Sequence, residues 1–216
     1  MHSCAAGARA YDARMANDLI NVHVILGSTR KNRFSEKIGK YVFDELQKVS
    51  GVRAELVDLR DWPLPFYDEP ASPSSTKGPY ASELANKWKA KVAEADAYIM
   101  IAPEYNHSMP AVLKNALDWV YYEWNNKPVG FVAYGSAMGA RSVEHLRQIA
   151  VELQMAPIRN AIHLPIDVLR AASGAPAYDA SLFAPLRQGP LDRVQGFFDQ
   201  LLWWARALKP AREAKK

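Results

Sequence analysis

The sequence contains one cysteine, and this scarcity excludes several chemistries at once. Cys4 stands near the start of a segment rich in Ala, Gly and Arg. No intrachain disulfide can form, and neither thiol chemistry nor a cysteine–metal site is expected. A chain without disulfides suits a reducing compartment, so we expect a cytoplasmic protein.

Long apolar runs are absent as well. Nothing approaches the roughly 20 residues that a membrane-spanning helix needs, so we expect no membrane partner. Residues 1–17 also lack the apolar centre of a signal peptide. We interpret 1–17 as a disordered leader with Met15 as a possible alternative start, and an organelle transit peptide is the other interpretation.

An excess of charge of one sign is lacking too. The 27 Lys and Arg residues exceed the 23 Asp and Glu residues only slightly, which gives a net charge of +4. This balance is typical of solvated surface, so we expect no nucleic-acid partner, and it disfavours an acidic electron shuttle that docks by a negative face. With 216 residues, 49% of them hydrophobic, the chain is long enough for a single domain over 18–208, followed by a solvated basic tail at 209–216.

The common nucleotide-binding and catalytic motifs are missing. Neither the glycine spacing of a dinucleotide fingerprint nor the ending of a nucleoside triphosphate loop occurs. Ser136 follows an apolar run as a hydrolase nucleophile would, but its flanks are not those of a Gly-x-Ser-x-Gly elbow. The five histidines show no pair at metal-ligand spacing beside a carboxylate, so no metal site is predicted and His23 is interpreted as a satisfied core residue.

Short apolar runs alternate with helical patterns along the chain. Strands are predicted at 22–26, 54–59, 97–102, 129–134 and 161–164, and helices at 34–49, 81–95, 110–120, 143–153 and 191–208. Such alternation predicts an α/β fold with a parallel sheet covered by helices on both faces, in which 54–59 and 161–164 are edge strands. Two stretches rich in Pro, 62–79 and 165–190, are predicted as loops. The first is either a functional lid or contact surface, or a plain surface crossover.

Polar loops follow three of the predicted strands, at Ser28, Glu104 and Ser136. Ligands of such sheets bind beyond the carboxyl ends of the strands, so these loops are expected to meet. The first loop offers the hydroxyl groups of Ser28, Thr29 and Ser35 and the guanidinium groups of Arg30 and Arg33 at the start of a helix. These groups suit one terminal monophosphate, although a capped turn with solvated basic residues would look the same.

Together these segments resemble a known family. The stretches 27–30 and 33–35, the tetrapeptide Pro-Glu-Tyr-Asn at 103–106 and the helix AVLKNALDW at 111–119 are similar to those of NADPH-dependent FMN reductases, which are flavodoxin-like quinone, chromate and azo reductases. The tetrapeptide between an apolar strand and Pro110 is the most specific of these features. The resemblance covers roughly 20–164 and implies a flavodoxin-like three-layer sandwich with a five-stranded parallel sheet.

The resemblance also implies a site for FMN. By similarity Ser28, Arg30 and Ser35 hold the FMN phosphate, while Arg33 and Phe34 line the same loop. The isoalloxazine and ribityl groups would contact Pro103, Glu104, Tyr105 and Asn106, and the pyrimidine edge would lie under Gly135, Ser136 and Gly139. The flavin itself accepts the hydride, so we name no catalytic side chain.

The function implied is an oxidoreductase that takes hydride from NADPH or NADH and passes electrons through FMN to a small acceptor, such as a quinone, free flavin, chromate or an azo compound. The alternative is an FMN-binding electron carrier or redox-sensing module without turnover of its own. In relatives the helix after the tetrapeptide helps to form a dimer. A homodimer or homotetramer is therefore expected, with Trp119, Tyr121, Tyr122 and Trp124 as candidate interface residues, although half of them could equally be core.

Overall fold

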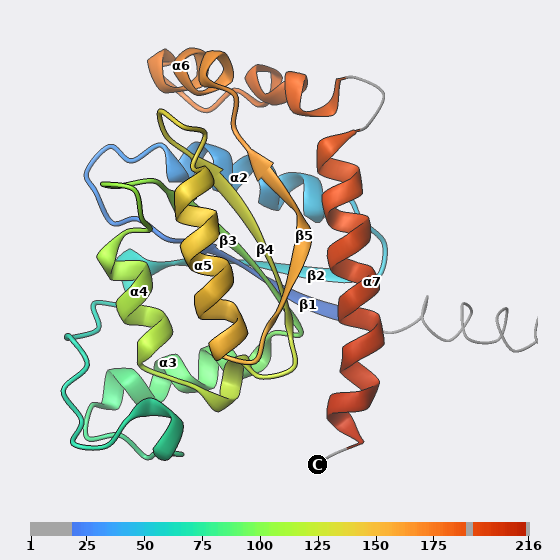
Figure 1. The fold of residues 1–216 in the computed structure, drawn as a ribbon. Coiled ribbons are helices and arrows are strands. Elements are labelled where there is room, and N and C mark those ends of the chain that lie inside the picture. The colour runs from blue at the N-terminus through green and yellow to red at the C-terminus, as the bar shows by residue number, and fades with distance from the viewer. Residues whose placement is uncertain (1–18, 189–191, 215–216) are drawn as a thin grey trace, which may run out of the picture.

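The computed structural model describes residues 19–188 and 192–214 (Figure 1). The leader predicted at 1–17 lies outside the described residues. Within them, five parallel strands form one sheet in the order β2-β1-β3-β4-β5. They are β1 (Ile20–Leu26), β2 (Val52–Asp58), β3 (Ala97–Pro103), β4 (Pro128–Tyr134) and β5 (Ala156–His163). This is the flavodoxin-like order, so the predicted fold class is confirmed.

Burial of the strands follows their position in the sheet. Every residue of β3 and β4 is buried, whereas β2 and β5 mix buried, half-buried and exposed positions. Central parallel strands need apolar side chains on both faces, and edge strands do not. The two predicted edge strands are thus confirmed. β5 begins at Ala156, earlier than predicted. The prediction began at residue 161 because Arg159 and Asn160 interrupt the apolar pattern before it.

The helices form two layers around the sheet. They are α2 (Ser35–Leu46), α3 (Glu83–Glu94), α4 (Ala111–Asp118), α5 (Ala140–Glu152), α6 (Ile166–Gly174) and α7 (Arg193–Glu213). One apolar core joins the sheet to α2 and α7, and the other joins it to α3, α4 and α5 (Figure 1). None of the helices in the described parts of the chain is long and apolar enough to span a bilayer.

The stretch 165–190 is not the irregular loop that its Pro and Gly residues predict. It contains α6 and a 3-10 helix, Ala180–Arg187. Pro165 stands at the N-cap of α6, where proline costs no hydrogen bond, and Val168 and Ala172 are buried beneath that helix. The prediction was wrong because proline and glycine were interpreted as helix breakers throughout the stretch.

The last helix also continues beyond residue 208, where its predicted end lies. α7 runs to Glu213, and near its end Lys209 and Arg212 lie 2.9 and 2.6 Å from the carboxylate oxygens of Asp96. These two ion pairs attach the basic end of the helix to the start of β3.

The long loop 62–79 packs against the helices below it. The Trp62 ring lies 5.1 Å from that of Trp88 on α3, and Trp119 donates a hydrogen bond of 2.6 Å from its indole N–H to the carbonyl of Pro65. Asn115 of α4 donates to the same carbonyl at 2.9 Å. The loop is therefore anchored along α3 and α4.

Candidate functional site

The three polar loops meet at one edge of the sheet. They follow β1, β3 and β4, which are adjacent strands, so their carboxyl ends lie side by side (Figure 1). The chain passes from β1 to β2 on one side and to β3 on the other, which makes the β1/β3 boundary the switch point where ligands of such sheets bind. The predicted convergence of the loops is confirmed.

Direct contacts join the first loop to the second. The buried Ser28 hydroxyl lies 2.9 Å from the Tyr105 hydroxyl, and the Arg30 guanidinium stands 5.9 Å from the centre of the Tyr105 ring. No carboxylate in the described parts of the chain pairs with Arg30, whose side chain is exposed. The loop therefore presents a cation whose charge is not neutralised within the described structure.

The helix that follows the first loop begins without a side-chain cap. Phe34 occupies the N-cap of α2, and its side chain offers no acceptor to the first N–H groups. The Ser35 hydroxyl is buried and has no hydrogen-bond partner among the described residues. Phe34 packs edge-on against Tyr134, with ring centres 5.0 Å apart, and burial raises the pKa of the Tyr134 phenol, so this ring stays uncharged.

Arg33 has a different environment from Arg30. Its buried guanidinium donates to the carboxylate of Asp58, to the carbonyl of Ser28 and, at 3.0 Å, to Glu36. Arg60 reinforces the same loop by donating to the carbonyl of Arg30 at 2.7 Å and to Glu36 at 2.5 Å. These two arginines hold the backbone of the loop in place.

The contacts with the two arginines lower the pKa of Asp58. Burial of the carboxyl group opposes ionisation, but the hydrogen bonds from the Arg33 side chain and from the backbone N–H of Arg60 outweigh it, so the pKa of Asp58 lies below its ordinary value. Asp58 is therefore an anion at neutral pH, and the loop is attached to the end of β2 by a full charge pair.

The second loop is a tight turn with unusual backbone angles. Tyr105 and Ser108 exchange backbone hydrogen bonds of 2.8 and 3.0 Å, and the two residues between them, Asn106 and His107, have φ values of 49° and 69°. Such left-handed backbone is costly outside glycine and is concentrated at functional sites. The turn holds the predicted residues in a single defined conformation.

Glu104 fixes this turn to the start of α5. Its carboxylate accepts a hydrogen bond of 3.2 Å from the backbone N–H of Arg141 and forms an ion pair with the guanidinium of the same residue. That guanidinium also lies 2.8 Å from Nε2 of His107. The Glu104 side chain is only 4% exposed, and the ion pair with Arg141 neutralises its buried charge.

The third loop depends on a glycine. Gly139 has a φ of 73°, and a Cβ atom there would lie 2.5 Å from that of Ala133. Gly135 lies directly over Glu104, whose Cβ would be 3.1 Å from an added Cβ. Ser136 lies between these glycines and is exposed, so all three predicted residues of the loop stand at the same edge of the sheet.

Comparison with known proteins agrees with this arrangement. The sequence profile of NADPH-dependent FMN reductases matches residues 20–167. The chain belongs to this family. The family's description names both FMN and NADPH, so the predicted enzyme class, an FMN-dependent oxidoreductase that uses NAD(P)H, is confirmed.

Individual relatives support the same conclusion. The chain is 36% identical to an NAD(P)H-dependent FMN reductase of Schizosaccharomyces pombe over 82% of its length and 88% of the relative. It is 33% identical to an NADPH:quinone oxidoreductase of Arabidopsis thaliana, over 75% and 80% of the two chains. A flavoenzyme NAD(P)H:(acceptor) oxidoreductase from Paracoccus denitrificans, FerB, superimposes with a TM-score of 0.63 at 25% identity, over 88% of this chain and 98% of FerB.

The first loop fits the phosphate that an FMN reductase must hold. The first turn of α2 has no side-chain cap, and among the described residues neither the Ser35 hydroxyl nor the Arg30 guanidinium has a protein acceptor. A terminal phosphate group supplies several acceptor oxygens at once. This donor set suits the FMN phosphate.

Sequence reasoning missed four residues of this FMN reductase that build the site, namely Glu36, Asp58, Arg60 and Arg141. Asp58 and Arg60 follow β2 at the same edge of the sheet as the first loop. The sequence could have indicated these two residues, because polar residues at the end of a strand next to β1 lie close to the loop that follows β1. Arg141 carried a weaker signal, because only its place directly after the third loop indicates a role.

Proposed function

We propose that this enzyme passes electrons from NAD(P)H through bound FMN to a quinone or a similar small acceptor, such as free flavin, chromate or an azo compound. The observation that supports it best is the junction of the first two loops, where the Ser28 hydroxyl meets Tyr105 beside the unneutralised charge of Arg30. A phosphate held there would place the attached flavin along the second and third loops. Relatives named as quinone oxidoreductases support the class of acceptor.

Each loop would have its own part in binding. Ser28, Arg30 and Ser35 would donate to the FMN phosphate, and Phe34 would line that loop. Arg33 would hold the loop in position without contacting the phosphate, because its guanidinium is directed to Asp58 and Glu36. This division separates residues that bind the cofactor from residues that position the loop.

The second and third loops would hold the flavin ring. Pro103, Glu104, Tyr105 and Asn106 would contact the isoalloxazine and ribityl groups, and Gly135, Ser136 and Gly139 would close over the pyrimidine edge. Bound FMN supplies the redox chemistry, since it accepts a hydride and passes two electrons on. The protein then has to bind the flavin, orient it and shield it from water. Glu104 can lie beside the flavin ring because Arg141 already neutralises its charge.

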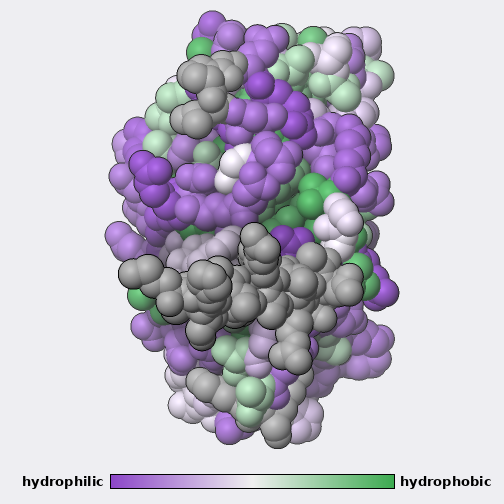
Figure 2. Space-filling model, turned by 90° about the vertical axis from the view of Figure 1, so that its right-hand side faces the viewer, coloured by the Kyte–Doolittle hydropathy of each residue, from purple (hydrophilic) through white to green (hydrophobic). Residues whose placement is uncertain are grey.

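The oligomeric state and compartment belong to the same proposal. We propose a cytoplasmic homodimer or homotetramer, on the strength of the family resemblance around α4. Trp119 and Trp124 are fully buried in the chain's own core and cannot form the interface, whereas Tyr122 is 39% exposed. The described residues in Figure 2 are mostly hydrophilic, with a hydrophobic area near the middle of the view. On α7 itself, Trp203 and Trp204 are 60% and 37% exposed, so this helix is a second candidate surface for assembly.

Purified protein tests the proposal directly. A flavin absorbance spectrum and the release of FMN on denaturation are expected first. Consumption of NADPH that depends on an added quinone is expected next, whereas bound FMN without such turnover would contradict the proposed electron transfer. Light scattering that gives a monomer at micromolar concentration with full FMN occupancy would contradict the assembly alone.

A further inference from the structure

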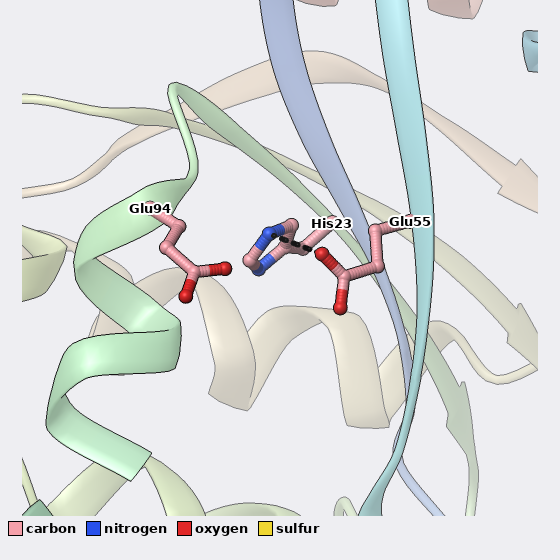
Figure 3. Close-up of side chains that lie close together, drawn as sticks. All are labelled: His23, Glu55 and Glu94. Atoms are coloured by element: carbon pink, nitrogen blue, oxygen red, sulfur yellow. Dashed lines mark ion pairs between the residues drawn. The ribbon is translucent and has the colours of Figure 1, made fainter. Parts of the chain in front are cut away.

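Three side chains that could bind a metal ion gather away from the FMN loops. His23 of β1 and Glu55 of β2 are register partners in the sheet, and Glu94 comes from the last turn of α3 (Figure 3). Each offers one nitrogen or oxygen atom, and these atoms all lie within 4.8 Å of one another. In Figure 3 both carboxylates are directed toward the imidazole ring from opposite sides.

His23 is held in place at this cluster. It is 3% exposed and packs edge-on near Tyr98. The ring is thus fixed in the sheet, and it offers one nitrogen to the cluster. Its Nε2 lies 3.4 Å from Glu55, longer than an ordinary hydrogen bond.

The two carboxylates are accessible and adjustable. The Glu55 and Glu94 side chains are 45% and 53% exposed, and they line a cavity of about 260 Å³ together with Asn21, His23 and Arg53. Zn²⁺ binds histidine nitrogen and carboxylate oxygen at about 2.0 to 2.2 Å. The ligand atoms must therefore approach one another, and exposed glutamate side chains can move while the buried ring stays fixed.

A protein cation already lies between these carboxylates. The Lys91 ammonium is 2.9 Å from Glu55 and 2.6 Å from Glu94. The two carboxylates therefore approach a single cation in this structure. The structure shows no hydrogen bond between this ammonium and His23, whereas a metal ion would use all three groups.

We propose that His23, Glu55 and Glu94 form a binding site for a divalent transition metal of the zinc class, in which the ion replaces the Lys91 ammonium and water completes its coordination. Three protein ligands with one open position make a recognised zinc arrangement. The ion would join β1, β2 and α3 at the middle of the two strands, away from the FMN loops that follow the carboxyl ends of the strands.

The spacing of these residues in the sequence gave no sign of the site. Metal motifs are recognised when ligands stand a few residues apart, and here each ligand comes from a separate element. Only the register of β1 against β2 and the end of α3 bring them together.

Titration calorimetry of the FMN-loaded full chain with zinc chloride tests the proposal. All variants carry Cys4→Ser, which removes the thiol of the leader. We expect one binding event in this parent, weakened at least tenfold by Glu94→Gln and by Glu55→Gln. Lys91→Met should instead strengthen it at least tenfold, because the competing ammonium is gone.

Matched controls come from the same helix. Glu83 and Lys87 of α3 form an exposed pair at 2.7 Å, so Glu83→Gln and Lys87→Met should leave the binding unchanged. A zinc-induced shift of the His23 imidazole resonances, present in the parent and absent in Glu94→Gln, tests the third ligand without altering the core. Equal titrations of the parent, Glu55→Gln and Glu94→Gln, or no gain in Lys91→Met, would overturn the proposal.

Discussion

The Arg33 guanidinium lies against the Asp58 carboxylate, with Nη1 2.7 Å from Oδ1, and this contact attaches the loop after β1 to the end of β2. Asp58 also accepts a hydrogen bond of 2.8 Å from the backbone N–H of Arg60. Because Arg33 is buried and its donors face Asp58, Glu36 and the Ser28 carbonyl, we infer that it shapes the phosphate loop from within.

Replacement of Arg33 should therefore destabilise the protein even without cofactor. We expect Arg33→Met to lower the free energy of unfolding of the apoprotein by about 1.5 to 3 kcal/mol, the scale of hydrogen bonds to charged groups. Urea unfolding measures it. Lys31→Met, an exposed change in the same loop, is the control and should alter the stability by less than about 0.5 kcal/mol. Equal stability of the two variants would mean that Arg33 is not structural.

The same contact predicts a dependence on pH. The pKa of Asp58 is lowered in the folded state, so its contribution to stability is present above the ordinary aspartate pKa of about 3.9 and is lost as the pH falls through the lower folded value. We expect wild type to exceed Asp58→Asn in stability at pH 7 and the difference to shrink below about pH 4. Urea unfolding at several pH values measures this, and a difference that stays constant down to pH 3 would argue against the charge pair.

Arg30 should act on the cofactor instead. We expect Arg30→Ala to weaken FMN binding by about 1.5 to 3 kcal/mol, because a charge-assisted hydrogen bond to the phosphate is lost. Riboflavin has no phosphate, so its weaker binding should be the same in wild type and variant. Titration of the apoprotein with both flavins measures the effect, and equal wild-type curves for FMN and riboflavin would remove the phosphate assignment.

Much of the fold follows from local pattern. The buried strands β3 and β4 stand out because uninterrupted apolar runs have few other uses in a chain of this size. The edge strand β5 was only half recognised, because polar residues stand in its middle. Arg159 is exposed there, and Asn160 is half-buried against α7, where its amide donates to the carbonyl of Gly196. Helix α6 was missed because Pro165 was interpreted as a breaker, although proline is compatible with the start of a helix.

The site was predicted less completely, and for a different reason. Sequence shows which residues follow a strand, so the three loops could be placed at one edge. It does not show which neighbours neutralise a charge. Arg30 and Arg33 look equivalent along the chain, yet only Arg33 meets Asp58. Glu104 looks like an ionisable group near the flavin until Arg141, from another element, is found beside it.

Gly139 should be intolerant of even one added methyl group. Its φ of 73° strains any other residue, and an added Cβ would lie 2.7 Å from the backbone nitrogen of Tyr134. Strain of this kind costs about 1 to 3 kcal/mol, and we expect Gly139→Ala to lose that stability together with FMN affinity. Gly174→Ala is the control, since an added Cβ there meets nothing within 4 Å. Thermal unfolding and flavin titration measure both variants, and a stable, FMN-replete Gly139→Ala protein would contradict the expected clash.

The proposed mechanism predicts little dependence on ionisable side chains. Donor and acceptor would use the same exposed face of the flavin ring in turn, so initial-rate plots should show parallel, ping-pong lines, and NADPH should bleach the flavin absorbance with no acceptor present. His107 and Glu104 stand nearest to this region in our assignment. The carboxylate of Glu104 is paired with Arg141, and Nε2 of His107 lies 2.8 Å from the same guanidinium.

His107→Ala should accordingly leave the chemistry largely intact. We expect kcat to change by less than about 10²-fold, the lower limit of general acid catalysis, provided that FMN occupancy, measured by absorbance, is unchanged. Two structural features give reason to expect a modest effect: the left-handed backbone at His107, which alanine disfavours, and the contact of the imidazole with Arg141. A His107→Gly variant should recover the part that is due to the backbone, since glycine accepts that backbone and has no side chain to transfer a proton. If both variants keep their flavin and lose several orders of magnitude in kcat, the imidazole takes part in the reaction and the flavin does not act alone. If the initial-rate lines intersect, donor and acceptor are bound together and do not use one flavin face in turn.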